Sequence, residues 1–79
     1  MNFKQLEAFV TVAEQGSFSR AAQSLYTSPT ALTGQLNALE RELECRLLER
    51  TYRGTEMTAA GKEFYASARE LLRLADAAV

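Results

Sequence analysis

The side chains best suited to chemistry in this sequence are neutral hydrogen-bonding groups gathered between positions 27 and 37. Threonine hydroxyls and a glutamine amide can hydrogen-bond the base edges or phosphate oxygens of DNA. Residues 28–39 contain no charged side chain, whereas a helix face in water normally alternates lysine and glutamate. We therefore expect a partner other than water on this segment. The candidate contact residues are Thr27, Ser28, Pro29, Thr30, Thr33, Gly34 and Gln35.

Positive charge is concentrated in residues 46–55, which hold three arginines and one glutamate, a balance of +2 against -1 for the whole chain. Arg53 lies at the tip of an expected hairpin, from which a cation can enter a minor groove or hold a phosphate. The alternative is a solvated turn residue. Arg50 lies on an expected strand, where we expect it to pair with Glu40 or Glu49 and to tie the hairpin to the preceding helix.

Catalysis and metal binding have little support in the residue types. The chain has no histidine, no glycine-rich phosphate loop and a single cysteine, so it lacks the usual general base and the ligands of a zinc site. We expect Cys45 to be a small buried hydrophobe and expect no cofactor. Glu40 and Glu44 share a helix face, but this spacing is far more often solvated than catalytic. A small enzyme is therefore the least favoured function class.

Helical periodicity predicts three helices that position the neutral segment. Apolar residues recur at helical spacing over residues 3–13, and Gly16 followed by Ser17 indicates a stop and a new N-cap. A short helix over residues 18–25 follows. Ser28 is the expected N-cap of a third helix, with a proline at its first position. Spacing alone fits a helix-turn-helix and an ordinary helical hairpin equally. The third helix carries an apolar stripe formed by Leu32, Leu36, Leu39 and Leu43.

The second half of the chain predicts a hairpin and a long helix. Residues 46–50 and 55–58 are candidate strands around a turn at 52–54. From Thr58 as N-cap, an alanine- and leucine-rich helix of about 30 Å runs to residue 79. Its apolar positions suit a seam with a second copy of the chain; the alternative is packing back onto its own core. The expected dimerisation residues are Phe64, Ala68, Leu71, Leu72, Ala75 and Ala78.

The uncharged segment 28–39 favours a helix-turn-helix over a helical hairpin. The elements then predict a mainly α fold, a winged helix-turn-helix of three helices and a two-stranded wing over residues 1–58, followed by a linker or dimerisation helix over residues 59–79. No segment has the apolar length of a signal peptide or membrane span, so we expect a cytoplasmic protein without a membrane partner.

The pI near 5.4 argues, taken alone, against binding to nucleic acid. A winged helix used as a protein-interaction module is therefore the alternative to a DNA-binding domain.

The order and separation of several motifs resemble the N-terminal domain of LysR-type transcriptional regulators over the whole chain. The motifs are Ser17-Phe18-Ser19-Arg20-Ala21-Ala22, Ala31-Leu32-Thr33-Gly34-Gln35-Leu36, Leu47-Leu48-Glu49-Arg50-Thr51 and Thr58-Ala59-Ala60-Gly61. The resemblance implies a linker helix that pairs with a partner's and homodimers or tetramers on an interrupted inverted repeat in double-stranded promoter DNA. It also implies that a small-molecule effector acts only through a further domain, which we expect beyond these residues.

By position, the resemblance assigns Pro29, Thr30, Thr33 and Gly34 to the reading helix and Arg53 to the wing. Two residues depart from the family pattern. The family commonly has arginine or lysine at the place of Gly34, so we expect discrimination to shift toward Thr33 and Arg53, or the backbone to approach DNA more closely. Glycine often stands at the place of Glu44, where we expect a strained or differently shaped helix end.

Overall fold

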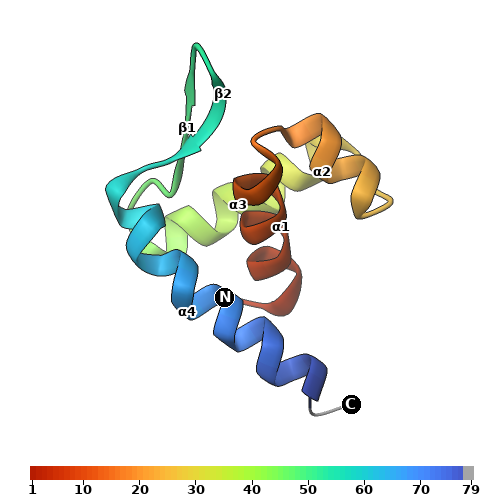
Figure 1. The fold of residues 1–79 in the computed structure, drawn as a ribbon, viewed down its shortest axis with the longest axis vertical. Helices are drawn as coiled ribbons and strands as arrows, with labels where there is room; N and C mark the ends of the chain where they lie inside the picture. Colours follow the sequence, from red (N-terminus) through yellow and green to blue (C-terminus); the bar gives the residue numbers. More distant parts are fainter. Residues whose placement is uncertain (78–79) are drawn as a thin grey trace.

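The computed structural model describes residues 1–77, and within them the predicted winged helix-turn-helix is confirmed (Figure 1). Its elements in chain order are α1 (Phe3–Gln15), α2 (Phe18–Ser24), α3 (Pro29–Leu43), β1 (Leu48–Thr51), β2 (Gly54–Met57) and α4 (Ala59–Ala77). The strands β1 and β2 pair antiparallel and form the wing. The wing and the C-terminal end of α4 lie at opposite ends of the molecule's longest axis. None of the helices described is long and apolar enough to cross a membrane.

Local capping explains where α1 and α2 begin. Asn2 accepts a hydrogen bond from the Gln5 amide at 2.8 Å, and the Gln5 side chain accepts one from the Asn2 amide at 3.0 Å. This reciprocal pair is a capping box, which satisfies two free amides at the helix start. α1 ends at Gly16, which adopts the left-handed region at a φ of 66°. The Ser17 hydroxyl then caps α2 by accepting from the Arg20 amide, so the predicted stop and fresh cap are confirmed.

α3 also begins where the sequence predicts. The Ser28 hydroxyl accepts a hydrogen bond from the Ala31 amide at 3.1 Å, and Pro29 occupies the first turn, where no amide donor is needed. The predicted apolar stripe of α3 faces the core: Leu32, Leu36 and Leu39 are buried against α1 and α2. The helix therefore has one face fixed to the core while its opposite face stays free.

The core lies where α1 meets every other helix. Its largest fully buried side chains are Phe9, Leu39, Leu47 and Val12. The first half of α4 completes it, because Ala68 is fully buried and the Phe64 ring lies 5.7 Å from the Phe9 ring. Part of the expected dimer seam packs within the domain, because Ala68 is fully buried and Phe64 lies partly against the core, whereas the seam as a whole stays a prediction.

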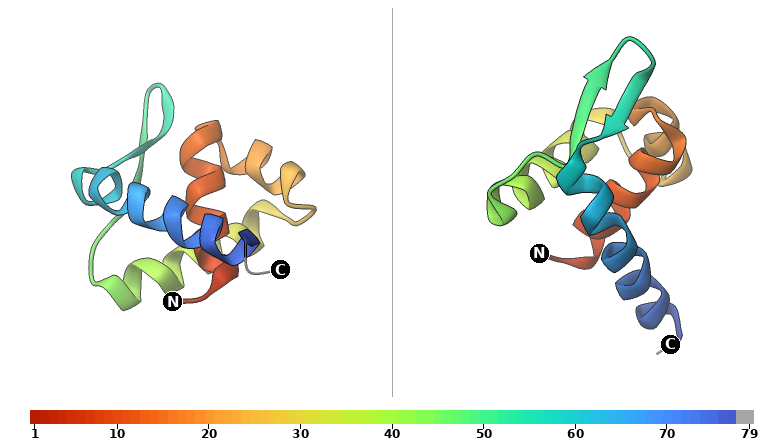
Figure 2. Two further views of the ribbon diagram at one scale, coloured as in Figure 1. Left: turned by 60° about the horizontal axis from the view of Figure 1, so that its bottom comes forward. Right: turned by 60° about the vertical axis from the view of Figure 1, so that its left-hand side comes forward.

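Past Ala68, α4 leaves the core, and its last turns extend beyond the other helices (Figure 2). Leu71 is 43% exposed and Leu74 is 51% exposed, while Leu72 still packs partly on the core. The expected seam residue Ala78 lies outside the described residues. The apolar surface that α4 leaves uncovered is therefore centred on Leu71 and Leu74.

Two local predictions are wrong. The strands are 48–51 and 54–57. The Thr58 amide still donates to the Leu47 carbonyl oxygen at 3.0 Å, but the Leu47 amide donates to Glu40 of α3 and not to the opposite strand, so the ladder ends at Leu48 and Met57. Cys45 is exposed, because α3 ends before it and the chain turns there on the surface.

Candidate nucleic-acid interface

Over residues 29–39 the free face of α3 is uncharged and rich in hydrogen-bonding groups, as the sequence predicts. Pro29, Thr30, Thr33 and Gly34 are all exposed. The Thr33 hydroxyl donates to the Pro29 carbonyl oxygen at 2.9 Å, which leaves its oxygen lone pairs and its methyl group for a ligand. A Cβ placed on Gly34 would meet no atom within 4 Å, so the face is open at this position. Such a surface suits contact with base edges in a groove.

The other predicted residues of this segment lie around the start of α3. Thr27 and Ser28 are exposed on the turn that leads into it. Gln35 is half-buried and, with Thr27, lines a shallow hollow that also contains Lys4 and Glu7 of α1. Gln35 therefore lies on the side of α3 toward α1, whereas Pro29 and Thr33 line a groove between α3 and the wing.

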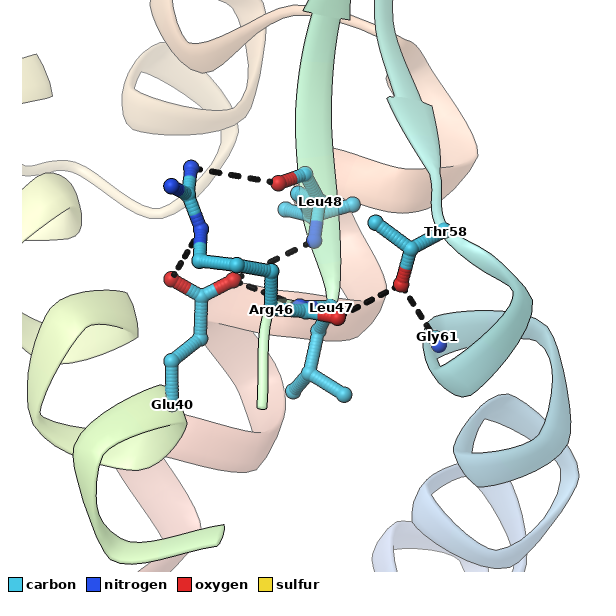
Figure 3. Close-up of polar contacts among 6 residues, drawn as sticks. All are labelled: Glu40, Arg46, Leu47, Leu48, Thr58 and Gly61. Atoms are coloured by element: carbon cyan, nitrogen blue, oxygen red, sulfur yellow. Dashed lines mark hydrogen bonds and ion pairs between the residues drawn. The ribbon is translucent and has the colours of Figure 1, made fainter. Parts of the chain in front are cut away.

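The buried carboxylate of Glu40 attaches the root of the wing to α3 (Figure 3). One of its oxygens accepts hydrogen bonds from the amides of Leu47 at 2.6 Å and Leu48 at 3.2 Å, and the other lies 3.4 Å from the Arg46 Nε. Buried amides rarely lack partners, and here a single side chain serves two of them. The prediction that Arg50 pairs with Glu40 is wrong. Arg46 forms this ion pair, because it directly precedes the two amides that Glu40 binds.

Thr58 extends this attachment to α4 (Figure 3). Its hydroxyl donates to the Arg46 carbonyl oxygen at 2.6 Å and accepts from the Gly61 amide at 3.0 Å, so it caps α4 as predicted. A Cβ on Gly61 would lie 2.1 Å from the Leu47 carbonyl oxygen, which makes glycine necessary for this close approach. α3, the wing and α4 thus meet at one junction and hold one another in place.

The wing is also attached along β2. The Thr55 amide donates to the Gly16 carbonyl oxygen at 3.2 Å, and a Cβ on Gly54 would come within 3.0 Å of the same oxygen. Gly54 has a φ of 117°, a conformation that side chains other than hydrogen disfavour. The strand therefore packs against the corner between α1 and α2, and the wing is fixed beside α3 rather than free.

Arg53 lies on the two-residue turn of the wing, with its side chain 68% exposed. Its Nε donates to the Tyr52 hydroxyl at 3.1 Å, and its guanidinium carbon lies 5.3 Å from the centre of the Tyr52 ring. The same Nε is 3.8 Å from the Glu56 carboxylate. Tyr52 thus orients the cation that the sequence predicts at the tip, and Glu56 partly neutralises it.

Arg50 is a candidate contact that the sequence reasoning missed. Its guanidinium carbon lies 5.6 Å from the centre of the Phe18 ring, and it forms no ion pair with a carboxylate of residues 1–77. It lines the groove between α3 and the wing together with Thr33 and Pro29. An unpaired cation held against an aromatic ring beside an uncharged helix face is suited to a phosphate. The ring is 32 residues away in sequence, so no local pattern indicates it.

The arginines of the wing lie apart from the acids at the end of α3. Arg50 and Arg53 lie on the wing beside the start of α3, whereas Glu42 and Glu44 lie at the far end of α3. The wing itself, residues 48–57, is neutral in sum, because Glu49 and Glu56 balance Arg50 and Arg53. Within residues 1–77, the cation without a carboxylate partner beside the uncharged part of α3 is Arg50. The overall pI conceals this arrangement.

A polar cluster also holds α4 against α1. The Glu14 carboxylate accepts hydrogen bonds from the Tyr65 hydroxyl and, at 2.8 Å, from Arg69. The hydrogen bond with Tyr65 and the charge of Glu14 raise the pKa of Arg69 above its usual value. Further along, a hydrogen bond from Arg73 lowers the pKa of the Glu70 carboxyl.

Residues 3–62 match the family described as bacterial regulatory helix-turn-helix protein, lysR family. The HTH-type transcriptional regulator TfdT of Cupriavidus pinatubonensis is 53% identical over 74 residues, which cover 94% of this chain and 32% of TfdT. TcbR of Pseudomonas sp., also an HTH-type transcriptional regulator, is 48% identical over 75 residues, 95% of this chain and 26% of TcbR. The chain therefore spans a third or less of the length of these relatives.

Solved structures show the same arrangement. The chain resembles the CbnR DNA-binding domain in the crystal structure of its complex with DNA, with a TM-score of 0.92 and 46% identity over 99% of this chain and 90% of that one. It also resembles the BenM DNA-binding domain bound to catB site 1 DNA, with a TM-score of 0.91 and 39% identity over 96% of this chain and 85% of that one.

Proposed function

Because the chain belongs to the LysR family of bacterial regulatory helix-turn-helix proteins, we propose that it binds double-stranded promoter DNA as the DNA-binding domain of a transcription regulator. The observation that carries this proposal is the likeness, over nearly the whole chain, to the CbnR domain solved with DNA. The relatives are transcriptional regulators by name, and we infer that this chain also acts by binding and not by catalysis, in the cytoplasm of a bacterium.

In this proposal α3 enters the major groove and the wing contacts the neighbouring minor groove. Thr30 and Thr33 meet base edges, for which hydroxyl oxygens and methyl groups are suitable partners. Arg53 at the wing tip enters the minor groove, where a cation finds negative potential. Arg50, between wing and helix, holds the phosphate backbone. The attachment of the wing through Glu40 and Gly16 keeps these groups at a set spacing.

Affinity must come from two copies of the domain. Few cations face the proposed DNA, so one domain neutralises few phosphates and binds weakly. Linking two domains raises the effective concentration of the second one at its half-site. We infer that the exposed turns of α4 around Leu71 and Leu74 pair with those of a second copy. This gives a homodimer, with a tetramer available to a longer chain.

We also infer that two parts of the chain have different functions. Residues 1–58 supply the reading surface, and residues 59–79 supply the linker to the partner. The first half of α4 also packs against the core. Residue 58 therefore marks a change of function and not the edge of a separately packed unit. Any response to a small-molecule effector belongs to a part of a longer protein outside these residues.

A selection from a pool of random duplexes tests the proposal. We expect the chain to enrich an inverted repeat at low salt, and we expect a Gly34→Arg variant to bind more tightly with a changed preference, because arginine adds a cation and a bidentate donor to an open position. No retention of any duplex at low salt would contradict DNA binding and favour the alternative, a winged helix that binds protein.

A further inference from the structure

Two tyrosines are far more exposed than any other large apolar or aromatic side chain among residues 1–77. Tyr26 is 97% exposed and Tyr52 is 91% exposed, whereas the next most exposed, Met1 and Leu74, reach 51%. Tyr52 contacts Arg53. Tyr26 lies on the turn between α2 and α3, and its side chain makes no hydrogen bond to any residue that the structure describes. The ring of Tyr26 thus adds nothing to the core.

The backbone of Tyr26 is unfavourable for a tyrosine. Its φ of 55° lies in the left-handed region, which favours glycine because the Cβ of other residues is crowded there. The turn is the usual glycine-type helix end: the Thr27 amide donates to the Ala22 carbonyl oxygen at 2.9 Å, and the Tyr26 amide donates to that of Gln23 at 3.3 Å. Glycine would make the same hydrogen bonds without strain. Neither stability nor burial therefore explains a tyrosine here.

Glu44 provides a comparison within the same chain. It is the other residue of 1–77, besides glycines, with a positive φ, at 57°. Its helix end has the same hydrogen bonds: the Cys45 amide donates to the Glu40 carbonyl oxygen at 3.2 Å, and the Glu44 amide to that of Arg41 at 3.3 Å. The two positions differ in place, because Glu44 follows the far end of α3 whereas Tyr26 comes two residues before its N-cap, Ser28.

We propose that Tyr26 is a DNA-backbone contact, with its phenol O–H donating a hydrogen bond to a phosphate oxygen at the edge of the groove that α3 enters. The proposal rests on the proposed function of this domain. Tyrosine hydroxyls are among the groups that contact DNA phosphates, and these contacts set the position of a reading helix. Residues 28–39 carry no cation that could hold a phosphate. A neutral hydrogen-bond donor beside the start of α3 therefore supplies part of the contact with the DNA backbone.

A neutral donor has a recognisable effect on binding. It releases no counterion, so removing it should weaken binding without changing the salt dependence of affinity. A phosphate contact also carries no sequence information, so the loss should be equal on different duplexes. An arginine contact would change the salt dependence, and a base contact would change the preference between duplexes.

The test compares Tyr26→Phe, Tyr26→Gly and, as matched control, Glu44→Gly. Each is titrated by fluorescence anisotropy against a duplex selected by the wild-type chain and an unrelated duplex, at several salt concentrations, and its Tm is measured. Tyr26→Phe should weaken binding to both duplexes about tenfold per half-site, with an unchanged salt slope and Tm. Tyr26→Gly should raise Tm by about 2–5 °C and yet bind at least as weakly. Glu44→Gly should raise Tm similarly and keep wild-type affinity.

Wild-type binding by Tyr26→Phe would overturn the proposal. A loss confined to the selected duplex would also overturn it, since Tyr26 would then contact a base. A wild-type chain that retains no duplex would instead contradict the proposed function, and the two failures are thereby distinct.

Discussion

At the scale of single residues, the proposed interface combines neutral groups on one element with cations on another. The Thr33 hydroxyl donates a hydrogen bond to the Pro29 carbonyl oxygen, and Arg53 contacts Tyr52 at the wing tip. Arg50 lies against Phe18 without a carboxylate partner in the described chain. We thus assign the sequence-independent attraction to DNA to two arginines, and the discrimination between base sequences to uncharged side chains of α3.

The two wing arginines should each account for about one unit of salt dependence. Arg53→Ala should weaken DNA binding and lower the slope of log affinity against log salt by about 1, and Arg50→Ala should do the same, because each removes one cation that displaces counterions from the DNA. Lys62→Ala is the control, since Lys62 is an exposed cation on α4 that is not among the proposed DNA contacts and lies more than two helical turns before Leu71. An unchanged slope for either wing variant would place that arginine outside the interface.

At the scale of elements, a single junction determines how α3, the wing and α4 lie relative to one another. Glu40 accepts from two amides at the root of the wing, and Thr58 joins the same segment to the start of α4. The positions of Arg50 and Arg53 beside α3 therefore depend on residues that need not touch DNA. Changes at this junction should reach the interface through the wing.

Loss of the Glu40 carboxylate should destabilise the fold and loosen the wing. Glu40→Ala leaves the buried amides of Leu47 and Leu48 without an acceptor, so we expect the free energy of unfolding to fall by about 2–3 kcal/mol. Faster hydrogen exchange at these two amides would identify the cause. Glu49→Ala, at an exposed site, should change stability by less than about 0.5 kcal/mol. Equal stability of both variants would show that the junction contributes little.

Two helical glycines should respond in opposite directions to alanine. Gly61→Ala should lower the free energy of unfolding by about 1–3 kcal/mol, because its Cβ would meet the Leu47 carbonyl oxygen and push α4 from the wing. Gly34→Ala should raise it by up to about 1 kcal/mol, because the site is open and alanine favours a helix. Urea denaturation measures both. Equal effects of the two changes would contradict the difference in close packing between these sites.

At the scale of the whole molecule, α4 has two roles along its length. Phe64 and Ala68 complete the core, whereas Leu71 and Leu74 remain exposed past the point where the helix leaves it. The wing lies at the other end of the longest axis (Figure 1). A second copy paired along the last turns of α4 would thus leave the proposed DNA-binding surface of each copy uncovered.

Charging this exposed surface should separate the two copies without unfolding the domain. We expect the double variant Leu71→Lys with Leu74→Lys to sediment as a monomer at a concentration where the wild-type chain sediments as a dimer, because lysines of like charge would face each other. Its affinity for a duplex with two half-sites should fall about 100-fold, while its affinity for one half-site stays unchanged. A dimeric double variant would place the interface elsewhere.

The helix starts, the caps at Ser17, Ser28 and Thr58 and the neutral face of α3 are determined by the sequence itself. A cap needs a hydroxyl and an amide three residues apart, and a buried stripe needs leucines at helical spacing, so both are local patterns. The hairpin was also predicted from its residues, with strand bounds one or two residues off, and the family resemblance added its role as a wing beside α3. Apart from those strand bounds, all of these agree with the tertiary structure.

Only the tertiary structure decided which distant groups meet. The partner of Glu40 is Arg46 instead of Arg50, Arg50 lies against a ring 32 residues earlier, and Cys45 is exposed. Each depends on the direction in which the chain leaves α3 and β1, which residue spacing does not encode. The same holds for α4, where periodicity describes one continuous stripe and only the edge of the core separates Ala68, which is buried, from Leu71, which is free for a partner.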